Sequence, residues 1–187
     1  MHLYVFDKEK KHILLQKRSP HADHYPNRYS ISVVGHVDAG EYSFKAVQRE
    51  LKEALGMDPH AIEIAFLFSY RQDVTVEPTY IDRQINDVYM CVVDRVDLKK
   101  IPYNTKDIAE VQWVPFEDFI KMVEGASDTS DLAPVYGKSC QDIVCFLTQH
   151  GTEHRHGQSH CTYFFILILN KQSLFRHFCT ENDSIRM

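Results

Sequence analysis

The sequence predicts an α+β sandwich in which helices pack on a mixed β-sheet. Apolar residues recur at helical spacing between residues 43 and 55, and segments rich in β-branched and aromatic residues lie on both sides of that stretch. Two further helical patterns follow Pro115. We expect one domain over residues 1–150, followed by an accessory strand or a poorly ordered tail over residues 151–187.

The composition excludes several classes of protein. The chain of 187 residues has the size of one domain, with 44% apolar and 25% charged residues. Its net charge of −5 argues against a nucleic-acid ligand, because proteins of that class usually carry basic patches. The apolar run at residues 163–169 is too short to cross a membrane. Five scattered cysteines and no visible secretory signal favour a cytoplasmic protein with reduced thiols.

The N-terminal part predicts a hairpin, with strands at residues 3–6 and 12–18 joined by a charged turn. A loop rich in His, Pro and Asn follows at residues 19–27. Residues 29–34 then alternate as a strand that ends at Gly35. This order brings the loop and the following helix to one end of a sheet.

That helix is expected to begin at Ser43, a good N-cap residue, and to end at Gly56, because glycine commonly follows the last residue of a helix. Its buried stripe is predicted from four residues at helical spacing: Phe44, Val47, Leu51 and Leu55.

The second half predicts strands at residues 61–70, 85–94 and 110–114, with a polar loop or hairpin end at residues 71–80. Pro115 opens a helix that ends near Gly125. Residues 139–149 repeat the helical pattern.

Glu50 and Glu53 are three residues apart, so both carboxylates project from one flank of the first helix. A lone pair of this kind is usually a solvated charged surface. Alternatively, the pair holds a hard cation such as Mg²⁺, which takes oxygen ligands from one or two carboxylates and from substrate phosphates.

The spacing around the pair resembles the Nudix hydrolase signature, which is fixed at positions from Gly35 to Met57 and is far more specific than a short glycine motif. This chain departs from the signature at one fixed position, where Ala54 replaces the second Glu of a Glu-Glu pair. The matching positions are Gly35, Glu41, Arg49, Glu50, Leu51, Glu53, Gly56 and Met57.

The resemblance implies an α/β/α Nudix sandwich and hydrolysis of a small-molecule diphosphate, such as a nucleoside diphosphate linked to another moiety, with Mg²⁺ or Mn²⁺ as cofactor. It implies that Glu50 and Glu53 are catalytic metal ligands and that the Gly35 carbonyl is a further ligand. Arg49 would be a third catalytic residue, and Arg49 and Glu41 would orient the carboxylates or brace the loop against the helix. Gly40 and Gly56 would support the site structurally.

Ala54 removes a carboxylate from inside this site, because it follows Glu50 by one helical turn. A replacement could approach from the strands, and the candidates are Asp82, Asp87 and Glu110. Gln84 is a second neutral residue where related proteins often carry an acid.

Residues 2–19 and 25–41 also resemble a Nudix subgroup related in sequence to isopentenyl diphosphate isomerase. The resemblance covers roughly residues 1–150 and implies that this chain is a shortened form that lacks an N-terminal strand. It also implies that the loop before the site lies near the substrate pocket, with Tyr25 and Arg28 in contact with substrate. Alternatively, this is an exposed polar loop in which Tyr25 and Pro26 form a turn.

Two alternatives to the hydrolase remain open. One is a catalytically weakened or inactive Nudix-fold module that binds a ligand, because a fold does not fix a function. The other, less favoured, is an isopentenyl diphosphate isomerase-like enzyme, since residues 30–41 lack the catalytic cysteine of that family. In the tail, His154, His156, His160 and Cys161 match no standard zinc spacing.

Overall fold

The computed structural model describes residues 1–77, 80–95, 98–125, 131–133 and 140–144. All of them belong to a compact unit, Met1–His154. The tail at residues 151–187, with its histidines and its expected accessory strand, lies outside the described residues. The division into a domain over residues 1–150 and a tail therefore stays a prediction.

The sheet is mixed and is built around β1 (His2–Asp7). β1 pairs antiparallel with β2 (His12–Arg18) and, at its start, with β4 (Val33–Val34), and it pairs parallel with β6 (Tyr80–Val93). The strand order is β3-β2-β1-β6-β5, with β7 paired to β2. The remaining strands are β3 (Tyr29–Ser30), β5 (Ile64–Glu77) and β7 (Ile108–Pro115).

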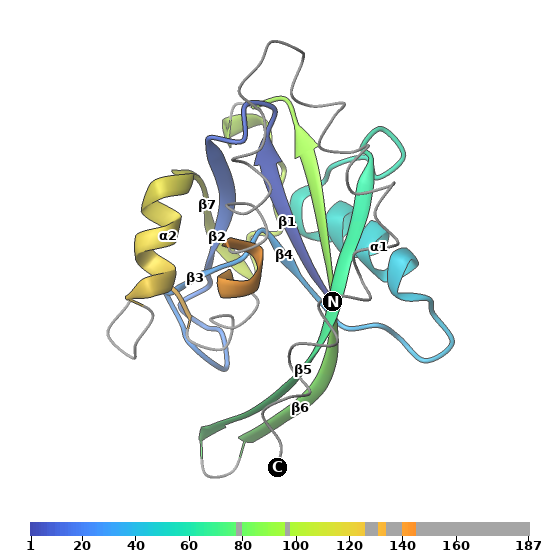
Figure 1. Cartoon of the computed structure of the whole chain (residues 1–187), viewed down its shortest axis with the longest axis vertical. Coiled ribbons are helices and arrows are strands. Elements are labelled where there is room, and N and C mark those ends of the chain that lie inside the picture. The colour runs from blue at the N-terminus through green and yellow to red at the C-terminus, as the bar shows by residue number, and fades with distance from the viewer. Residues whose placement is uncertain (78–79, 96–97, 126–130, 134–139, 145–187) are drawn as a thin grey trace, which may run out of the picture. The chain divides into compact units, whose positions relative to one another are not determined.

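Helices cover both faces of this sheet (Figure 1). Side chains alternate along β1, and Leu3 and Val5 pack in one core cluster with residues of α1 (Ser43–Leu55). On the other face, the Tyr4 hydroxyl donates to Cys140 Sγ at 3.6 Å, in the helical residues 140–144. The Phe6 ring lies 6.0 Å from the ring of Phe116, the first residue of α2 (Phe116–Glu124). The predicted α+β sandwich is confirmed.

α1 ends as expected but begins differently. Gly56 has the left-handed φ of 62°, and its amide donates to the Lys52 carbonyl at 2.9 Å. The prediction that Ser43 caps the helix is wrong. Tyr42 is the N-cap and makes no side-chain cap bond, while the Ser43 hydroxyl accepts a hydrogen bond from Tyr89 at 3.1 Å.

The buried stripe of α1 also differs at one residue. Val47, Leu51 and Leu55 are buried as predicted, but Phe44 is 45% exposed and Ala46 is buried instead. Phe44 lies in the first turn at the margin of the helix, where its ring contacts Tyr89 with 6.3 Å between centroids.

Residues 71–80 form the end of a hairpin, which was one of the two alternatives predicted, and not a loop, because β5 continues to Glu77 and β6 begins at Tyr80. The polar residues belong to a long hairpin. On its exposed face, Arg83 Nε donates to Asp73 Oδ1 at 3.0 Å. On its other face, the buried Asn86 donates to Gln72 Oε1 at 3.1 Å. At its other end, β5 begins at Ile64 and not at residue 61.

The single strand predicted at residues 29–34 is two short strands. β3 pairs with β2 and β4 pairs with β1, so the chain crosses between partners at residues 31 and 32. Ser32 bridges this crossing, because its hydroxyl accepts from the Val5 amide at 2.8 Å and donates to the Leu14 carbonyl at 2.5 Å.

The later elements follow the sequence more closely. α2 follows its N-cap Pro115 and ends at Gly125, with Phe119 and Val123 buried. Residues 140–144 are helical within the predicted range 139–149. A short 3-10 helix, η1 (Leu98–Lys100), precedes β7. Within the described ranges, no helix is long and apolar enough to cross a membrane.

Candidate functional site

The candidate site begins where β4 gives way to the loop before α1. The Glu41 amide donates to the Asp38 carbonyl at 2.9 Å, and the Asp38 amide donates to Glu41 Oε2 at 3.2 Å, which closes a tight turn. Gly40 has a φ of 85° in this turn. A left-handed residue at this point favours glycine, so the turn accounts for Gly40.

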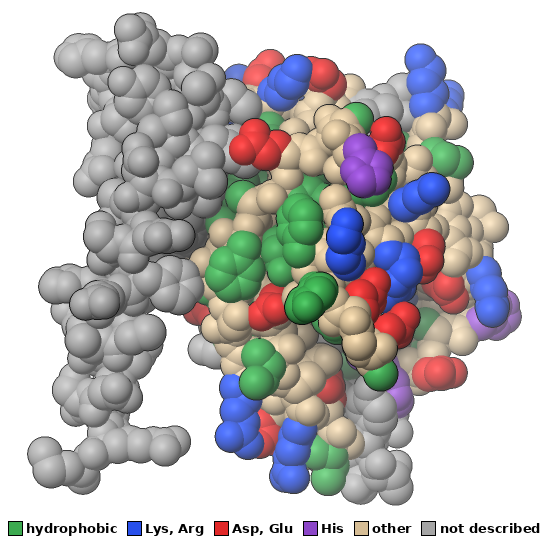
Figure 2. Space-filling view, turned by 90° about the vertical axis from the view of Figure 1, so that its right-hand side faces the viewer, with side chains coloured by type: hydrophobic (Ala, Val, Ile, Leu, Met, Phe, Trp, Pro, Cys, Tyr) green, Lys and Arg blue, Asp and Glu red, His purple; other side chains and the backbone are tan. Residues whose placement is uncertain are grey.

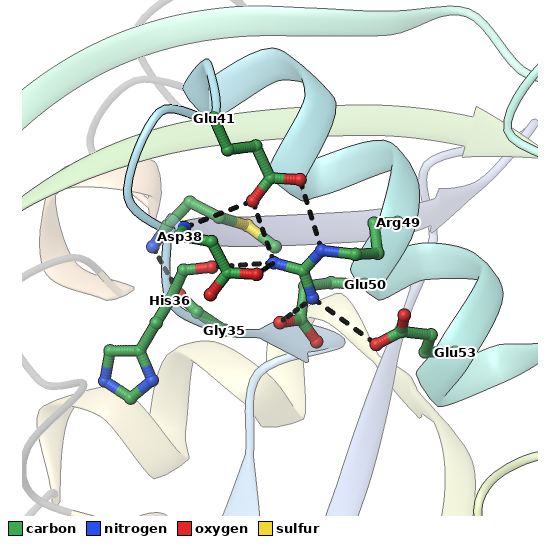
Figure 3. Close-up of polar contacts among 8 residues, drawn as sticks. Gly35, His36, Asp38, Glu41, Arg49, Glu50 and Glu53 are labelled. Atoms are coloured by element: carbon green, nitrogen blue, oxygen red, sulfur yellow. Dashed lines mark hydrogen bonds and ion pairs between the residues drawn. The ribbon is translucent and has the colours of Figure 1, made fainter.

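Arg49 joins the loop to α1 (Figure 3). Its Nε and Nη2 donate to the two carboxylate oxygens of Glu41 at 3.1 and 2.9 Å. Nη2 also donates to the His36 carbonyl at 3.0 Å. This two-pronged pairing fixes the guanidinium plane. It lowers the pKa of Glu41 and, together with Glu50, raises the pKa of Arg49 above its ordinary value.

The same guanidinium holds both candidate ligands on α1. Nη1 donates to Glu50 Oε1 at 2.9 Å and to Glu53 Oε2 at 3.4 Å. The Glu50 side chain is 19% exposed and that of Glu53 is 59% exposed. One carboxylate is therefore fixed near the protein interior, and the other remains open to solvent.

Glu50 also lies directly against Gly35. A Cβ built on Gly35 would overlap the Glu50 carboxyl group. The glycine at position 35 therefore leaves room for a carboxylate next to the backbone, and both groups offer oxygen atoms.

The Gly35 carbonyl accepts a hydrogen bond from the amino group of Met1 at 2.7 Å. Burial lowers the pKa of this amino group, whereas the charges of Asp87 and Glu50 raise it. Burial is the larger effect, so the pKa of the amino group lies below its ordinary value despite the two carboxylates.

These residues fit a divalent cation in part. The Gly35 carbonyl and the Glu50 carboxylate are hard oxygen donors of the kind that Mg²⁺ takes. Among the described residues, however, no three His, Cys, Asp or Glu side chains converge on one point. Two carboxylates suffice for Mg²⁺ when substrate phosphates complete its ligands, so the donor set suits an ion that binds with substrate.

Ala54 is half-buried and packs against the core cluster on the α1 side of the sheet. Its backbone carbonyl accepts from the Asn104 amide at 3.0 Å. An apolar residue thus stands one turn after Glu50.

The other predicted site residues lie apart from this group in the chain. Gly56 ends α1, where a Cβ would meet the Pro102 ring. Tyr25 and Arg28 lie in the turn between β2 and β3, and the Arg28 amide donates to the Tyr25 carbonyl at 3.4 Å. Their contact with substrate stays a prediction.

Asp38 was missed by the sequence reasoning. Its carboxylate lies 3.7 Å from Arg49 Nη2 and is 73% exposed, so it adds negative charge at the rim of the site. The available signal was its spacing of three residues from Glu41 in a turn that contains Gly40.

The protein face that carries α1 also has exposed apolar side chains. Figure 2 shows hydrophobic side chains beside acidic and basic ones on this side of the molecule. The exposed hydrophobic residues include Tyr42, Phe44 and Phe66. The Tyr89 ring links two of them, with its centroid 5.5 Å from that of Phe66 and 6.3 Å from that of Phe44.

Comparisons with known proteins show the family of the chain. The family model described as NUDIX domain matches residues 1–134. A relative from Arabidopsis thaliana, "Nudix hydrolase 3", is 32% identical over 161 residues, which are 83% of this chain and 21% of the relative. The chain thus spans about a fifth of the length of that curated relative.

Solved structures share the fold. A Deinococcus radiodurans protein superposes with a TM-score of 0.59 at 20% identity, covering 75% of this chain and 79% of that one. The E. coli dihydroneopterin triphosphate pyrophosphohydrolase superposes with a TM-score of 0.53 at 16% identity, covering 72% and 90%.

Proposed function

This chain belongs to the NUDIX domain family, and from that premise we propose that it is a divalent-metal-dependent hydrolase of phosphoanhydrides. The substrate class is a nucleoside diphosphate linked to another moiety, or a similar small diphosphate. The observation that carries the proposal is that Arg49 holds Glu50 and Glu53 on one guanidinium while Glu50 lies against Gly35.

Mg²⁺ or Mn²⁺, when bound, would neutralise phosphate charge and lower the pKa of the attacking water. The Gly35 carbonyl and the carboxylates of Glu50 and Glu53 would hold it. Glu53 is the more exposed of the two carboxylates and lies more open to an incoming phosphate.

Side chains of the protein position the carboxylate that would act on the attacking water. Arg49 binds Glu50 Oε1, which leaves Oε2 of the same carboxylate to accept the proton of the water. Glu41 fixes the guanidinium plane through its two hydrogen bonds, so the loop and α1 keep one geometry. Such preorganised groups need no rearrangement when charge develops during the reaction.

Names of similar proteins support the reaction class. The Arabidopsis relative is called a Nudix hydrolase, and the similar E. coli structure is a pyrophosphohydrolase of a triphosphate. We also propose that the chain belongs to the subgroup related in sequence to isopentenyl diphosphate isomerase. A cytoplasmic location is part of the same proposal.

A ligand-binding module without turnover is the second candidate, and Ala54 favours it by removing a carboxylate next to Glu50. The test is product analysis on a panel of nucleoside diphosphate derivatives and isopentenyl diphosphate, with Mg²⁺, with Mn²⁺ and with EDTA. The hydrolase releases two phosphate-bearing products only when metal is present. An isomerised product, or binding without any product, would decide for one of the alternatives.

A further inference from the structure

We propose that the outer edge of β5 is a dimer interface, at which the strand pairs antiparallel with β5 of a second copy of this chain. The pairing is centred on Gln72, so that Arg71 of each copy lies opposite Asp73 of the other. The inference does not rest on the proposed hydrolase activity, because these residues lie outside the segment from Gly35 to Met57.

β5 is the last strand of the sheet. In the order β3-β2-β1-β6-β5, β6 lies between β1 and β5, and β5 pairs with β6 alone among the described strands. Alternate residues along the outer side of β5 therefore present an amide and a carbonyl with no described strand beside them. The hairpin of β5 and β6 extends past the other strands (Figure 1). A second extended strand would satisfy these backbone groups.

Two irregularities limit the part of β5 that can pair. The register with β6 shifts between Phe66 and Phe68, and again between Thr75 and Glu77. Such irregularities disrupt the hydrogen-bond ladder and increase the local twist of a strand. β5 is therefore regular between Phe68 and Thr75, and Gln72 lies inside this stretch.

The regular stretch carries opposite charges on one face. Side chains alternate along a strand, and both Arg71 and Asp73 lie on the exposed face, where Arg71 Nη2 is 3.3 Å from Asp73 Oδ2. Asp73 Oδ1 also accepts a hydrogen bond from Arg83 Nε of β6 at 3.0 Å. The side chain of Arg71 is 76% exposed and that of Asp73 is 46% exposed, so both can reach a neighbouring strand.

The symmetry of a dimer selects one register. Two antiparallel copies of one strand are related by a twofold axis perpendicular to the sheet, so residues equally far from a central residue lie opposite each other. With Gln72 at the centre, Arg71 of each copy lies opposite Asp73 of the other, and opposite charges across strands stabilise a sheet. With the centre at Arg71 or at Asp73, two like charges would meet at the axis.

In this register each Asp73 carboxylate lies between two guanidinium groups. Arg83 of the same chain is its neighbour on β6, and Arg71 of the second copy would be its neighbour across the new pair. Ser69 would lie opposite Thr75, so the ends of the pairing bring no charges together. A network of several charges stabilises more than an isolated surface ion pair does. This charge pattern therefore fits a second copy of β5.

The test is sedimentation equilibrium of the purified full chain over a range of concentrations. The native protein should form dimers, and Arg71→Asp and Asp73→Arg should each weaken self-association at least tenfold, because like charges then face each other. Lys121→Asp is the control, since it reverses an exposed charge that pairs with Asp118 on α2. Its dimerisation constant should stay within twofold of the native value. Circular dichroism verifies that the variants are folded.

Mixing the two hairpin variants distinguishes this interface from any other. In an equimolar mixture, the two acids of Arg71→Asp face the two arginines of Asp73→Arg, so heterodimers should form with at least the native affinity. A native protein that remains monomeric, or single variants that dimerise as the native protein does, would overturn the inference. Variants that lose self-association and form no heterodimer on mixing would overturn it as well, because the charges would then not face each other.

Discussion

The Glu50 carboxyl group occupies the space in which a side chain on Gly35 would lie. The backbone conformation does not explain the glycine, because the φ of Gly35 is not left-handed. The contact with Glu50 is therefore the reason that this position requires a glycine. The loop can bring its carbonyl next to a carboxylate only because no Cβ intervenes.

Gly35→Ala is therefore expected to displace Glu50 and to weaken Mn²⁺ binding at least tenfold, as measured by calorimetry. Gly125→Ala is the matched control, because it lies at the end of α2 with an ordinary negative φ. A Cβ there would meet the Lys121 carbonyl at 3.3 Å, so a small change in melting temperature is expected. Equal Mn²⁺ affinities of native protein and Gly35→Ala would contradict the account of this contact.

Ala54→Glu is expected to raise Mn²⁺ affinity about tenfold, because the new carboxylate lies one turn after Glu50 on the same side of α1. The half-buried position should cost stability of about 1 kcal/mol, since a charged group replaces an apolar contact with the core. Calorimetry and urea unfolding measure the two effects separately. An unchanged or reduced Mn²⁺ affinity in a folded variant would show that position 54 is not part of the site.

Arg49→Lys is expected to raise the pKa of Glu41 toward its ordinary value, because an ammonium cannot donate to both carboxylate oxygens as the guanidinium does. Carboxyl chemical shifts in an NMR titration report this pKa. Turnover should fall about tenfold, since Glu50 and Glu53 lose their shared anchor. Arg71→Lys, at an exposed arginine next to Asp73, serves as the control and should leave both quantities unchanged.

His2 should make the protein less stable in acid. Burial and the nearby amino group lower its pKa from 6.5 to about 3, so the folded protein keeps His2 neutral while the unfolded chain binds a proton. The contribution is fully present above pH 6.5 and is lost as the pH falls toward 3, by at most about 5 kcal/mol at 1.36 kcal/mol per pKa unit.

The measurement is urea unfolding at several pH values for the native protein and for His2→Gln, with His60→Gln at an exposed position as control. The native protein and His60→Gln should lose stability more steeply between pH 6.5 and 4 than His2→Gln does. Parallel curves for all three proteins would mean that His2 does not titrate as its burial requires.

The sequence predicted the core of the fold because local pattern and tertiary packing agree there. Val47, Leu51 and Leu55 repeat at helical spacing and are buried, and Gly56 ends α1 with the conformation that glycine allows. The N-cap of α1 could not be predicted from the local sequence pattern. Ser43 resembles a cap, but the Tyr89 hydroxyl, which comes from a distant strand, binds its oxygen.

The errors in the strands have the same origin. Gln72 looks like a loop residue, yet it is buried and bonded to Asn86 across the hairpin. Residues 29–34 alternate like one strand, yet Ser32 marks the change of partner from β2 to β1. Polar side chains that bond to partners far along the chain carry no local signal.

In the candidate site, the spacing predicted that Arg49, Glu50 and Glu53 form one group, because they share a helix, and their side chains do contact one another. The position of Asp38 beside Arg49 depends on the loop turn, which only the structure supplies. Asp82, one of the acidic residues expected as a replacement, instead accepts hydrogen bonds from Gln72 and Gln84.

The most direct test of the central claim is the Mg²⁺-dependent hydrolysis rate of the best diphosphate substrate for native protein, Glu50→Gln and Glu53→Gln. The same change at Glu124, an exposed residue at the end of α2, is the control. We expect turnover in native protein and in Glu124→Gln, with losses of at least a hundredfold in Glu50→Gln and tenfold in Glu53→Gln. Native turnover that persists in both site variants would contradict the assignment of these carboxylates, and a folded native protein without turnover would contradict the hydrolase itself.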